Sequence, residues 1–326
     1  MVLASMDSLV RLLICPRCGS SLVEEIRGFR CTDLTCRYAV TNSFPIIGGW
    51  PVVVDFERSV LMAQVVTERS TALEGTEVSM ALHRSGIQRV PRSLRGIWKP
   101  LNRVAERNVS RLLDMLPGRR SRVLVVGGGT VGNGLGRLYA CGDETEVIGI
   151  DLYGSDVTQL VADAHAIPLQ TGSVDAVIVQ AVLEHVLAPM EVVREIHRVL
   201  TDDGLVYAET PFMQQVHAGA YDFTRFTASG HRYLFRWFEE IDSGPTAGPG
   251  TQLLWSLDHL VRGLTRSQTA GRLVRAFLFG LRFLDRYVDR AYSLDAASAV
   301  YFLGRRSDTE MTPTDIVAYY GGAQRS

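Results

Sequence analysis

Lysine is almost missing from this chain, because Lys99 is its only lysine and the other basic residues are arginines. We interpret this imbalance as a reflection of genome composition rather than of function. The net charge is −1, so no overall basic field attracts nucleic acid. No uncharged apolar run reaches the roughly 20 residues that cross a bilayer, and the first residues lack the basic start and the cleavage site of a signal peptide. These absences predict a cytoplasmic protein.

The composition is that of a folded globular protein. The chain has 326 residues, of which 46% are hydrophobic and 21% are charged, enough for one full α/β domain and a smaller module. We expect the module in residues 1–55, a helical, arginine-rich linker in 56–104, the main domain in 105–309 and a polar tail in 310–326. Within the main domain, residues 253–292 are predicted to form a helical insertion or cap.

Four of the five cysteines lie within 22 residues near the start of the chain. Cys15 and Cys18 form one close pair and Cys31 and Cys36 another, and two such pairs can place four thiolates around a tetrahedral Zn²⁺ ion. Four cysteine ligands leave no open position, so this zinc would be structural. Disulfides are the alternative, although cytoplasmic thiols stay reduced. The fifth cysteine, Cys141, is expected to be a small buried hydrophobe.

A buried strand runs into a glycine-rich turn in the middle of the chain. Residues 123–126 are apolar, as in a central parallel strand, and the glycines within 127–134 allow a sharp turn close to a ligand. Asp151 ends the next strand, 147–151, where a carboxylate can accept both hydroxyls of a ribose. By itself this combination also fits NAD.

Further strands and helices alternate along the main domain. Strands are expected at 174–180 and 204–209, a helix at 190–200 and a last, edge strand at 299–303. The alternation predicts a doubly wound, mostly parallel α/β sheet with helices on both faces, of the kind that holds a nucleotide-like cofactor.

Three later segments narrow the cofactor class. Residues 163–169 read Asp-Ala-His-Ala-Ile-Pro-Leu, residues 182–186 read Val-Leu-Glu-His-Val, and residues 195–204 read Glu-Ile-His-Arg-Val-Leu-Thr-Asp-Asp-Gly. With these segments, residues 105–240 resemble the class I S-adenosylmethionine-dependent methyltransferases of the type 11 branch. The resemblance implies a Rossmann-like methyltransferase sheet with S-adenosylmethionine as cofactor, and a dehydrogenase has no place for these segments.

The resemblance assigns the two ends of the cofactor to particular residues. The backbone of Gly127, Gly128 and Gly129 would face its methionine part, and Asp151 would bind its ribose.

The same resemblance assigns the adenine and the sulfonium. Asp163 would accept a hydrogen bond from the adenine amino group, and Ala164 would frame the ring. Gln180 and Ala181, at the end of a strand, would border the sulfonium. The structural alternative for Asp163 is a helix N-cap.

The N-terminal segment carries a second resemblance. Its cysteines, followed by Phe-Pro-Ile-Ile-Gly-Gly-Trp-Pro at 44–51, resemble the small zinc-ribbon proteins that activate translation-related methyltransferases. They also resemble the zinc module of certain bacterial ribosomal RNA methyltransferases.

The segment 209–227 follows a predicted strand and mixes polar with aromatic residues. It resembles a segment of methyltransferases associated with saccharide or cell-envelope synthesis. Transfer to a hydroxyl needs a base, for which His217 and Asp222 are candidates and His185 is a further one. Arg225 would either hold an anionic group or brace Asp222.

The sequence therefore predicts a methyltransferase that acts on a small-molecule, saccharide or lipid-linked acceptor, by O-methylation. One alternative is an rRNA or tRNA methyltransferase whose zinc module binds RNA, although the Asn/Asp-Pro-Pro-Tyr/Phe motif for base amines is absent. A second is a non-catalytic binding scaffold, because Val131 stands where a glycine is usual. The amphipathic residues 253–292 would lie on a membrane near a lipid-linked acceptor or cap the site.

Overall fold

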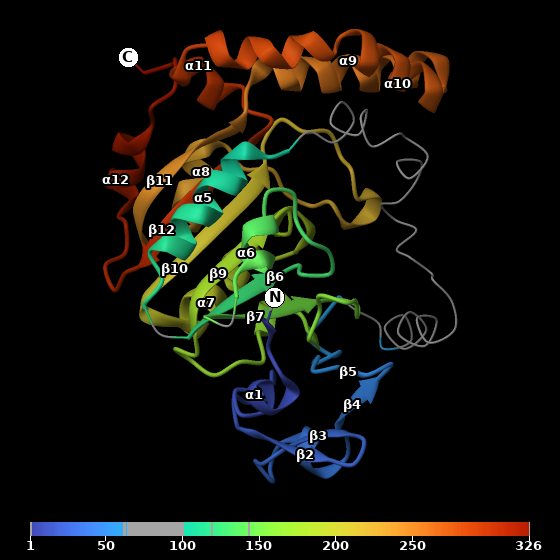
Figure 1. The fold of residues 1–326 in the computed structure, drawn as a ribbon, viewed down its shortest axis with the longest axis vertical. Helices are drawn as coiled ribbons and strands as arrows, with labels where there is room; N and C mark the ends of the chain where they lie inside the picture. Colours follow the sequence, from blue (N-terminus) through green and yellow to red (C-terminus); the bar gives the residue numbers. More distant parts are fainter. Residues whose placement is uncertain (1, 61–62, 64–100, 119, 143, 326) are drawn as a thin grey trace.

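The computed structural model describes residues 2–60, 63, 101–118, 120–142 and 144–325. Its main body is a twisted sheet of eight strands with helices on both faces (Figure 1). This arrangement confirms the predicted doubly wound α/β fold. The predicted helical linker, 56–104, lies almost wholly outside the described residues.

The strands of the main sheet follow the order β1-β7-β6-β9-β10-β12-β11, and β8 also pairs with β7. Their bounds are β1 (Val2–Leu3), β6 (Ser121–Val126), β7 (Thr145–Asp151), β8 (Leu160–Val161), β9 (Val174–Gln180), β10 (Leu200–Pro211), β11 (Phe238–Ala247) and β12 (Ala299–Arg306). The strands from β1 to β10 in this order run parallel, whereas β12 runs antiparallel to both of its neighbours.

Strand β6 is apolar on both faces because both faces are covered. Leu124 and Val126 pack into one buried cluster, and Val123 and Val125 pack into another on the opposite side. A continuous apolar run is what a central parallel strand requires, and the run at 123–126 marks this strand correctly.

Each face of the sheet is covered by amphipathic helices. On one side lie α5 (Arg103–Asp114) and α6 (Gly136–Ala140), and on the other lie α1 (Met6–Val10), α7 (Pro189–Val199) and α8 (Ala228–Leu234). In α5, the Asn102 side chain caps the helix by accepting from the backbone N–H of Ala105 at 3.0 Å. Its buried residues Ala105, Val109 and Leu112 recur at helical spacing.

The predicted edge strand at 299–303 is wrong in its position. Strand β12 lies between β10 and β11, with Leu303 opposite Tyr207 on one side and Asp242 on the other. The edge is instead β11, a strand that the sequence analysis did not predict. Its residues are mostly half-exposed and include Pro245, so it lacks the continuous apolar run of a covered strand.

Residues 13–55, here called the cysteine module, contain a small antiparallel sheet, whereas β1 and α1 before them belong to the main body. It consists of β2 (Leu22–Glu25), β3 (Gly28–Cys31), β4 (Phe44–Ile47) and β5 (Trp50–Pro51), with the short helix α2 (Arg37–Val40) beside it. The ring of Tyr38 stacks on Phe44 at 4.2 Å between centroids. The indole N–H of Trp50 donates to the carbonyl of Thr158 at 3.0 Å, so the module is attached to the main body.

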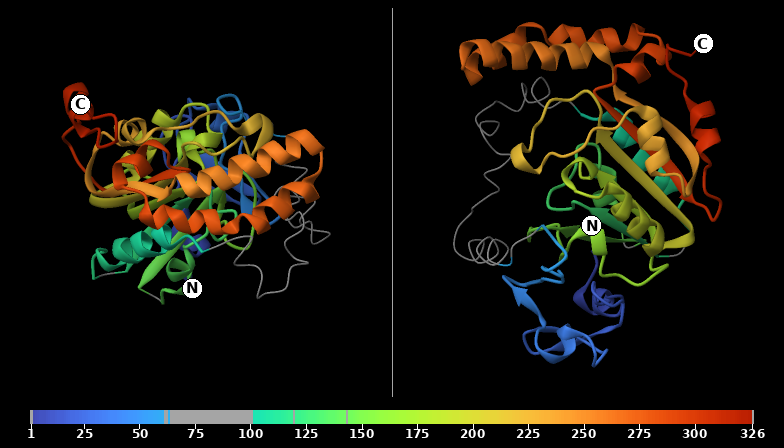
Figure 2. Two further views of the ribbon diagram at one scale, coloured as in Figure 1. Left: turned by 90° about the horizontal axis from the view of Figure 1, so that it is seen from above. Right: turned by 180° about the vertical axis from the view of Figure 1, so that it is seen from behind.

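The helical character predicted for 253–292 is present. This part of the chain forms α9 (Pro249–Thr265), α10 (Gln268–Phe277), the 3₁₀ helix η6 (Phe279–Tyr287) and α11 (Arg290–Asp295). Helices α9 and α10 lie side by side at the end of the molecule opposite the cysteine module (Figures 1 and 2). No helix in the described ranges is both long and apolar enough to cross a membrane.

Two smaller points concern the predicted polar tail and Cys141. The predicted polar tail, 310–326, contains the helix α12 (Pro313–Tyr319), which begins with a capping box formed by Thr312 and Asp315. Cys141 is half-exposed rather than buried, because it follows the last turn of α6 at the surface.

Candidate active site

The strand order of the main sheet reverses at β6. Strand β6 has β7 on one side and β9 on the other, and the parallel strands share one direction. In open α/β sheets, ligands bind outside the carboxyl ends of the strands where the order reverses. The glycine loop leaves β6 at this edge, and Gln180 ends β9 there with Ala181 directly after it, so the structure brings these predicted residues to the same edge.

The glycine loop contacts Asp151 directly. The backbone N–H of Gly129 donates to Oδ2 of Asp151 at 2.7 Å, and the N–H of Leu152 donates to Oδ1 at 2.6 Å. A Cβ atom on residue 129 would lie 2.7 Å from the same Oδ2, so the contact requires glycine. Burial raises the pKa of Asp151 to about 6, although these backbone hydrogen bonds oppose the rise.

Steric contacts also explain why residues 127 and 128 are glycines. Gly127 has a φ of 75°, and a Cβ there would meet the Val182 side chain at 2.3 Å. A Cβ on Gly128 would lie 3.0 Å from the Cα of Gly149 in β7. The loop backbone therefore packs tightly on its neighbours, and the N–H groups of Gly128 and Gly129 donate to the carbonyl of Ile150 and to Asp151. This close cradle fits a nucleotide-like cofactor such as S-adenosylmethionine.

Asp163 caps the short 3₁₀ helix η3 (Ala164–Ala166), which contains Ala164. Its Oδ1 accepts from the backbone N–H of His165 at 2.9 Å and lies 2.6 Å from Nδ1 of the same residue, and the Ser59 hydroxyl donates to Oδ2. Burial opposes ionisation, but these hydrogen bonds outweigh it and lower the pKa of Asp163. The N-cap alternative is thus present, and an adenine amino group would have to share an oxygen that already has a partner.

Asp163 also lines a cavity of about 470 Å³ between the cysteine module and the main sheet. Module residues Cys15 and Val53 line one side, and His165 and Arg198 line the other. The predicted adenine end of the cofactor site is therefore bordered by residues that come from the module.

At the ends of β9 and β10, Gln180 belongs to a buried polar network that the sequence analysis missed. Its Nε2 donates to Oε2 of Glu209 at 2.7 Å, and Glu209 also accepts from the hydroxyl of Tyr207 at 2.5 Å and from Nδ2 of Asn102 at 2.9 Å. Burial raises the pKa of Glu209 in spite of these hydrogen bonds. Glu209 ends the predicted strand 204–209, and a carboxylate at the end of an apolar run was the available signal, as it was for Asp151.

Ala181 has a φ of 54°, in the left-handed region that favours glycine. Its N–H donates to the carbonyl of Glu209 at 3.0 Å, which ties the end of β9 to β10. Strained backbone of this kind occurs at functional sites more often than elsewhere. Ala181 lies at such a place, the switch point of the sheet, where the strand order reverses.

The predicted base candidates His185 and His217 meet beside Glu184. Glu184 and His185 belong to the 3₁₀ helix η4 (Leu183–His185), and His217 lies in the loop after β10. Nε2 of each histidine is 3.6 Å from Oε1 of Glu184, and the two imidazole rings are 4.9 Å apart. The nearby Glu184 carboxylate raises the pKa of His217.

Asp222, the third base candidate, is held by Arg225. Oδ2 of Asp222 accepts from Nη2 of Arg225 and from the backbone N–H of His217, both at 2.9 Å. Arg225 also donates to the carbonyls of Gln214 and Gln215 at 3.0 and 3.2 Å. The hydrogen bonds from Arg225 hold the pKa of Asp222 far below its usual range, so Arg225 braces Asp222, and Asp222 is a weak proton acceptor.

The four predicted zinc ligands come together in the cysteine module. The sulfur atoms of Cys15 and Cys36 are 3.8 Å apart, and those of Cys18 and Cys31 are 3.4 Å apart. All four sulfurs lie within 4.8 Å of one another, close to the separation of about 3.8 Å that a tetrahedron with Zn–S bonds of about 2.3 Å requires. All five cysteines are free, so the disulfide alternative is not what the structure shows.

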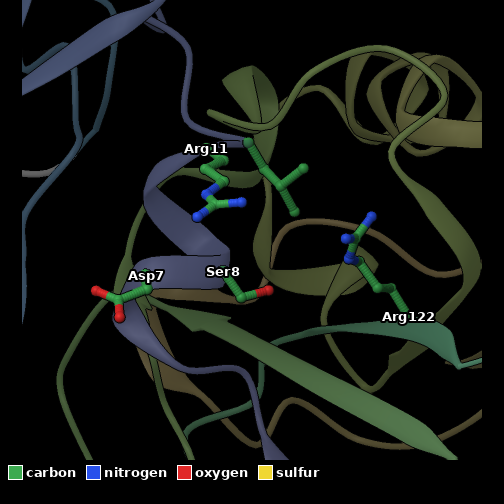
Figure 3. Close-up of a pocket in the computed structure, with 5 residues that line it drawn as sticks. Asp7, Ser8, Arg11 and Arg122 are labelled. Carbon is green, nitrogen blue, oxygen red and sulfur yellow. The ribbon is translucent and has the colours of Figure 1, made fainter.

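A second recess lies far from these groups. It has a volume of about 260 Å³, and Figure 3 shows Arg11 and Arg122 on its two sides. Arg122 is at the amino end of β6, the end opposite to the glycine loop, so this recess is not part of the candidate active site.

A comparison with known protein families finds a match in the central part of the main sheet. Residues 124–208, from β6 to β10, match a family model described as a methyltransferase domain. This part of the chain is therefore similar to methyltransferase domains. The matched part includes the glycine loop, Asp151, Asp163 and Glu184. No curated protein is similar enough in sequence to match the chain.

Solved structures with a similar fold are distant in sequence. A protein described as a sarcosine dimethylglycine methyltransferase, from Galdieria sulphuraria, has 15% identity and a TM-score of 0.43, covering 63% of this chain and 86% of its own. An S-adenosylmethionine-dependent methyltransferase from Archaeoglobus fulgidus has 14% identity and a TM-score of 0.41, with coverages of 66% and 98%. The 1,6-didemethyltoxoflavin-N1-methyltransferase of Burkholderia thailandensis has 16% identity and a TM-score of 0.39, with coverages of 66% and 83%. Likenesses at this level carry no argument about the acceptor.

Proposed function

We propose that the methyltransferase domain transfers a methyl group from S-adenosylmethionine to an oxygen of a small-molecule, saccharide or lipid-linked acceptor. The observation that carries the cofactor part is the contact between Gly129 and Asp151 at the switch point of the sheet. The bound cofactor would supply a methyl group already activated by the sulfonium. The protein therefore has to bind, orient and shield the reactants.

Each end of the proposed cofactor site has its own residues. The backbone of Gly127, Gly128 and Gly129 would face the methionine part, and Asp151 would accept hydrogen bonds from the ribose hydroxyls. Gln180 and Ala181 would border the sulfonium, where Glu209 holds the Gln180 side chain in place.

The proposed acceptor side lies next to the cofactor side. The loop after β10 brings His217 to His185, and an imidazole has a pKa in the range suited to taking a proton from a hydroxyl. Asp222, held by Arg225, would position His217 through its backbone N–H. These contacts support an acceptor with an ionisable oxygen.

Binding measurements test the cofactor assignment. Calorimetry on the full chain should show micromolar binding of S-adenosylhomocysteine and none of NADH. Asp151→Ala should weaken this binding at least tenfold, whereas Asp156→Ala, at an exposed aspartate nearby, should leave it unchanged. Binding of NADH alone would overturn the proposal, and binding of neither would favour the scaffold alternative.

Labelling identifies the acceptor class. Radiolabelled S-adenosylmethionine should transfer its methyl group to small-molecule, glycan or lipid fractions of a cell extract. Label found only in rRNA or tRNA would favour the alternative of an RNA methyltransferase. The observation that favours this second candidate is the cysteine module, which is attached to the domain beside Asp163.

We also propose that Cys15, Cys18, Cys31 and Cys36 hold a structural Zn²⁺. The close quartet of sulfurs supports this assignment, and so does the small size of the module.

Residues 253–292 have two proposed roles, peripheral contact with a membrane and a cap over the candidate active site. Leu264, Leu273 and Phe277 are largely exposed, which suits peripheral contact with a membrane. The contact between Gln215 and Ser256, at 3.1 Å, places α9 against the loop after β10 and suits a cap. Sedimentation with anionic vesicles, in which Phe277→Ser should reduce the bound fraction, tests the first use. Cytoplasmic location stays a prediction.

A further inference from the structure

Glu184 is a buried carboxylate without a hydrogen bond. Its side chain has no exposed area, and neither Oε1 nor Oε2 has a hydrogen-bond partner among the described residues. The groups that face it are the two Nε2 atoms of His185 and His217, each 3.6 Å from Oε1. An unpaired buried carboxylate is costly, so this position calls for a cation.

The two histidines are oriented as metal ligands usually are. Nδ1 of His185 lies 2.7 Å from the carbonyl oxygen of Tyr221. A carbonyl can only accept, so Nδ1 carries a hydrogen, and Nε2 is the ring nitrogen that faces Glu184. A ligating histidine almost always has its other ring nitrogen held by a carbonyl or a carboxylate.

His217 repeats this pattern with a carboxylate. Its Nδ1 lies 3.4 Å from Oδ2 of Asp222, which Arg225 holds in turn, although Nδ1 makes no hydrogen bond among the described residues. Both imidazoles thus present Nε2 to the same carboxylate oxygen. Nδ1 of His185 is held by the Tyr221 carbonyl, and Nδ1 of His217 faces the Asp222 carboxylate.

We propose that Glu184, His185 and His217 form a binding site for a divalent transition-metal ion. Their three ligand atoms lie within 4.8 Å of one another. Ligand atoms about 2.1 Å from an ion lie roughly 3.0 to 3.5 Å from one another. Each Nε2 is 3.6 Å from Oε1 of Glu184, so a small movement of the side chains would bring these atoms to ligand separation. Two imidazole nitrogens and one carboxylate suit Zn²⁺, Fe²⁺ or Mn²⁺ better than Ca²⁺.

This site is separate from the four cysteines in both chemistry and place. Three protein ligands leave positions open for water or for an oxygen of a substrate, whereas the cysteine quartet leaves none. The role of the ion in catalysis, as a holder of the acceptor oxygen, rests on the proposed function. An imidazole nitrogen bound to a metal cannot also accept a proton, so in the metal-loaded protein His185 and His217 are ligands rather than bases.

Cobalt binding by the full chain tests the proposal. After removal of metals by a chelator, Co²⁺ is titrated while calorimetry counts the bound ions and absorption reports the ligands. Thiolate ligands add an intense near-ultraviolet band, which imidazole and carboxylate ligands do not. We expect the chain to bind two equivalents of Co²⁺. The ion at the four cysteines should add the thiolate band, and the ion at Glu184, His185 and His217 should add none.

Two variants and a control assign this equivalent. Glu184→Gln, which keeps the side-chain volume, and His217→Ala should each lose the equivalent without the thiolate band and keep the other. His259→Ala, at an exposed histidine on α9, should keep both. Circular dichroism melting shows that the variants are folded, and His185→Ala replaces any variant that is not.

The proposal is overturned if the wild-type chain binds Co²⁺ only with the thiolate band, or if folded Glu184→Gln and His217→Ala bind as much as wild type. Binding of S-adenosylhomocysteine is measured on the same samples. If the variants lose the metal but still bind S-adenosylhomocysteine, the metal site is supported. If the wild-type chain binds the metal but not S-adenosylhomocysteine, only the proposed function is refuted.

Discussion

The backbone N–H of Gly129 donates a hydrogen bond to Oδ2 of Asp151 at 2.7 Å. This contact joins the first turn of the glycine loop to the end of the neighbouring strand, β7. It therefore links two motifs that lie 22 residues apart in the chain, at the edge where the strand order reverses. A side chain on residue 129 would displace either the carboxylate or the ring of Tyr153.

Gly129→Ala should reduce the affinity for S-adenosylhomocysteine at least tenfold while the protein stays folded. The added Cβ would stand 2.7 Å from Oδ2 of Asp151 and 2.6 Å from the Tyr153 ring, so the ribose-binding carboxylate would have to move. Gly136→Ala is the matched control, because a Cβ there meets nothing within 4 Å. Equal affinity of both variants in calorimetry would contradict the assignment of the loop.

Cofactor affinity should fall as the pH drops below about 6. Burial raises the pKa of Asp151 from 3.8 to about 6, and the protonated carboxyl can accept fewer hydrogen bonds from a ribose. Calorimetry of S-adenosylhomocysteine binding between pH 5 and 8 measures this dependence. Asp151→Asn should bind weakly with a flat profile, and an unchanged profile in this variant would assign the titration to another group.

The same shift makes Asp151 oppose folding at neutral pH. Between about pH 4 and 6 the folded protein retains a proton that the unfolded chain has released. The contribution of Asp151 to the free energy of unfolding is therefore greatest below pH 4 and is lost as the pH rises to 6. The difference between wild type and Asp151→Asn in urea unfolding should change across this window, and a constant difference would show that the pKa of Asp151 is not raised.

Cys31→Ser should remove one equivalent of zinc and loosen the cysteine module. Metal binding and folding are coupled in small modules of this kind, so the variant should melt at a lower temperature and be cleaved by protease within residues 13–55. Cys141→Ser, at a cysteine outside the quartet, should match the wild type in both respects. Elemental analysis that finds a folded, zinc-free wild type would refute the structural zinc.

Arg198→Ala should lower the free energy of unfolding by about 2–3 kcal/mol. The guanidinium donates to the carbonyls of Ile167 and Leu169, each at 2.7 Å, and pairs with Glu195. These bonds hold the segment after η3 against α7. Arg198→Lys should restore little of the loss, because an ammonium cannot reproduce the planar set of donors.

Arg272→Ala is the matched control for this measurement, since Arg272 is exposed on α10. Denaturant unfolding should give this variant a free energy within about 0.5 kcal/mol of the wild type. A similar small effect for Arg198→Ala would mean that solvent replaces its hydrogen bonds.

The central strands were predictable from their composition alone. The apolar runs that became β6, β7 and β9 are covered on both faces, so their hydrophobicity is continuous and their ends are abrupt. Strand β11 escaped prediction because an edge strand needs no such run. The position of β12 was wrong for a related reason. Whether β12 has a neighbour on one side or on both depends on where β10 and β11 lie. The residues of β12 alone do not indicate it.

The sequence by itself determined the fold class, the glycine loop with Asp151, and the cysteine quartet, because each depends on residues that are neighbours or follow a regular spacing. The tertiary structure alone decided which distant polar groups meet. Glu209 joins Asn102 and Gln180 only because β10 pairs with β9 and α5 packs beside them. His217 reaches Glu184 only because the loop after β10 folds back over η4. Such contacts depend on strand pairing and loop closure over the whole sheet, which local patterns do not encode.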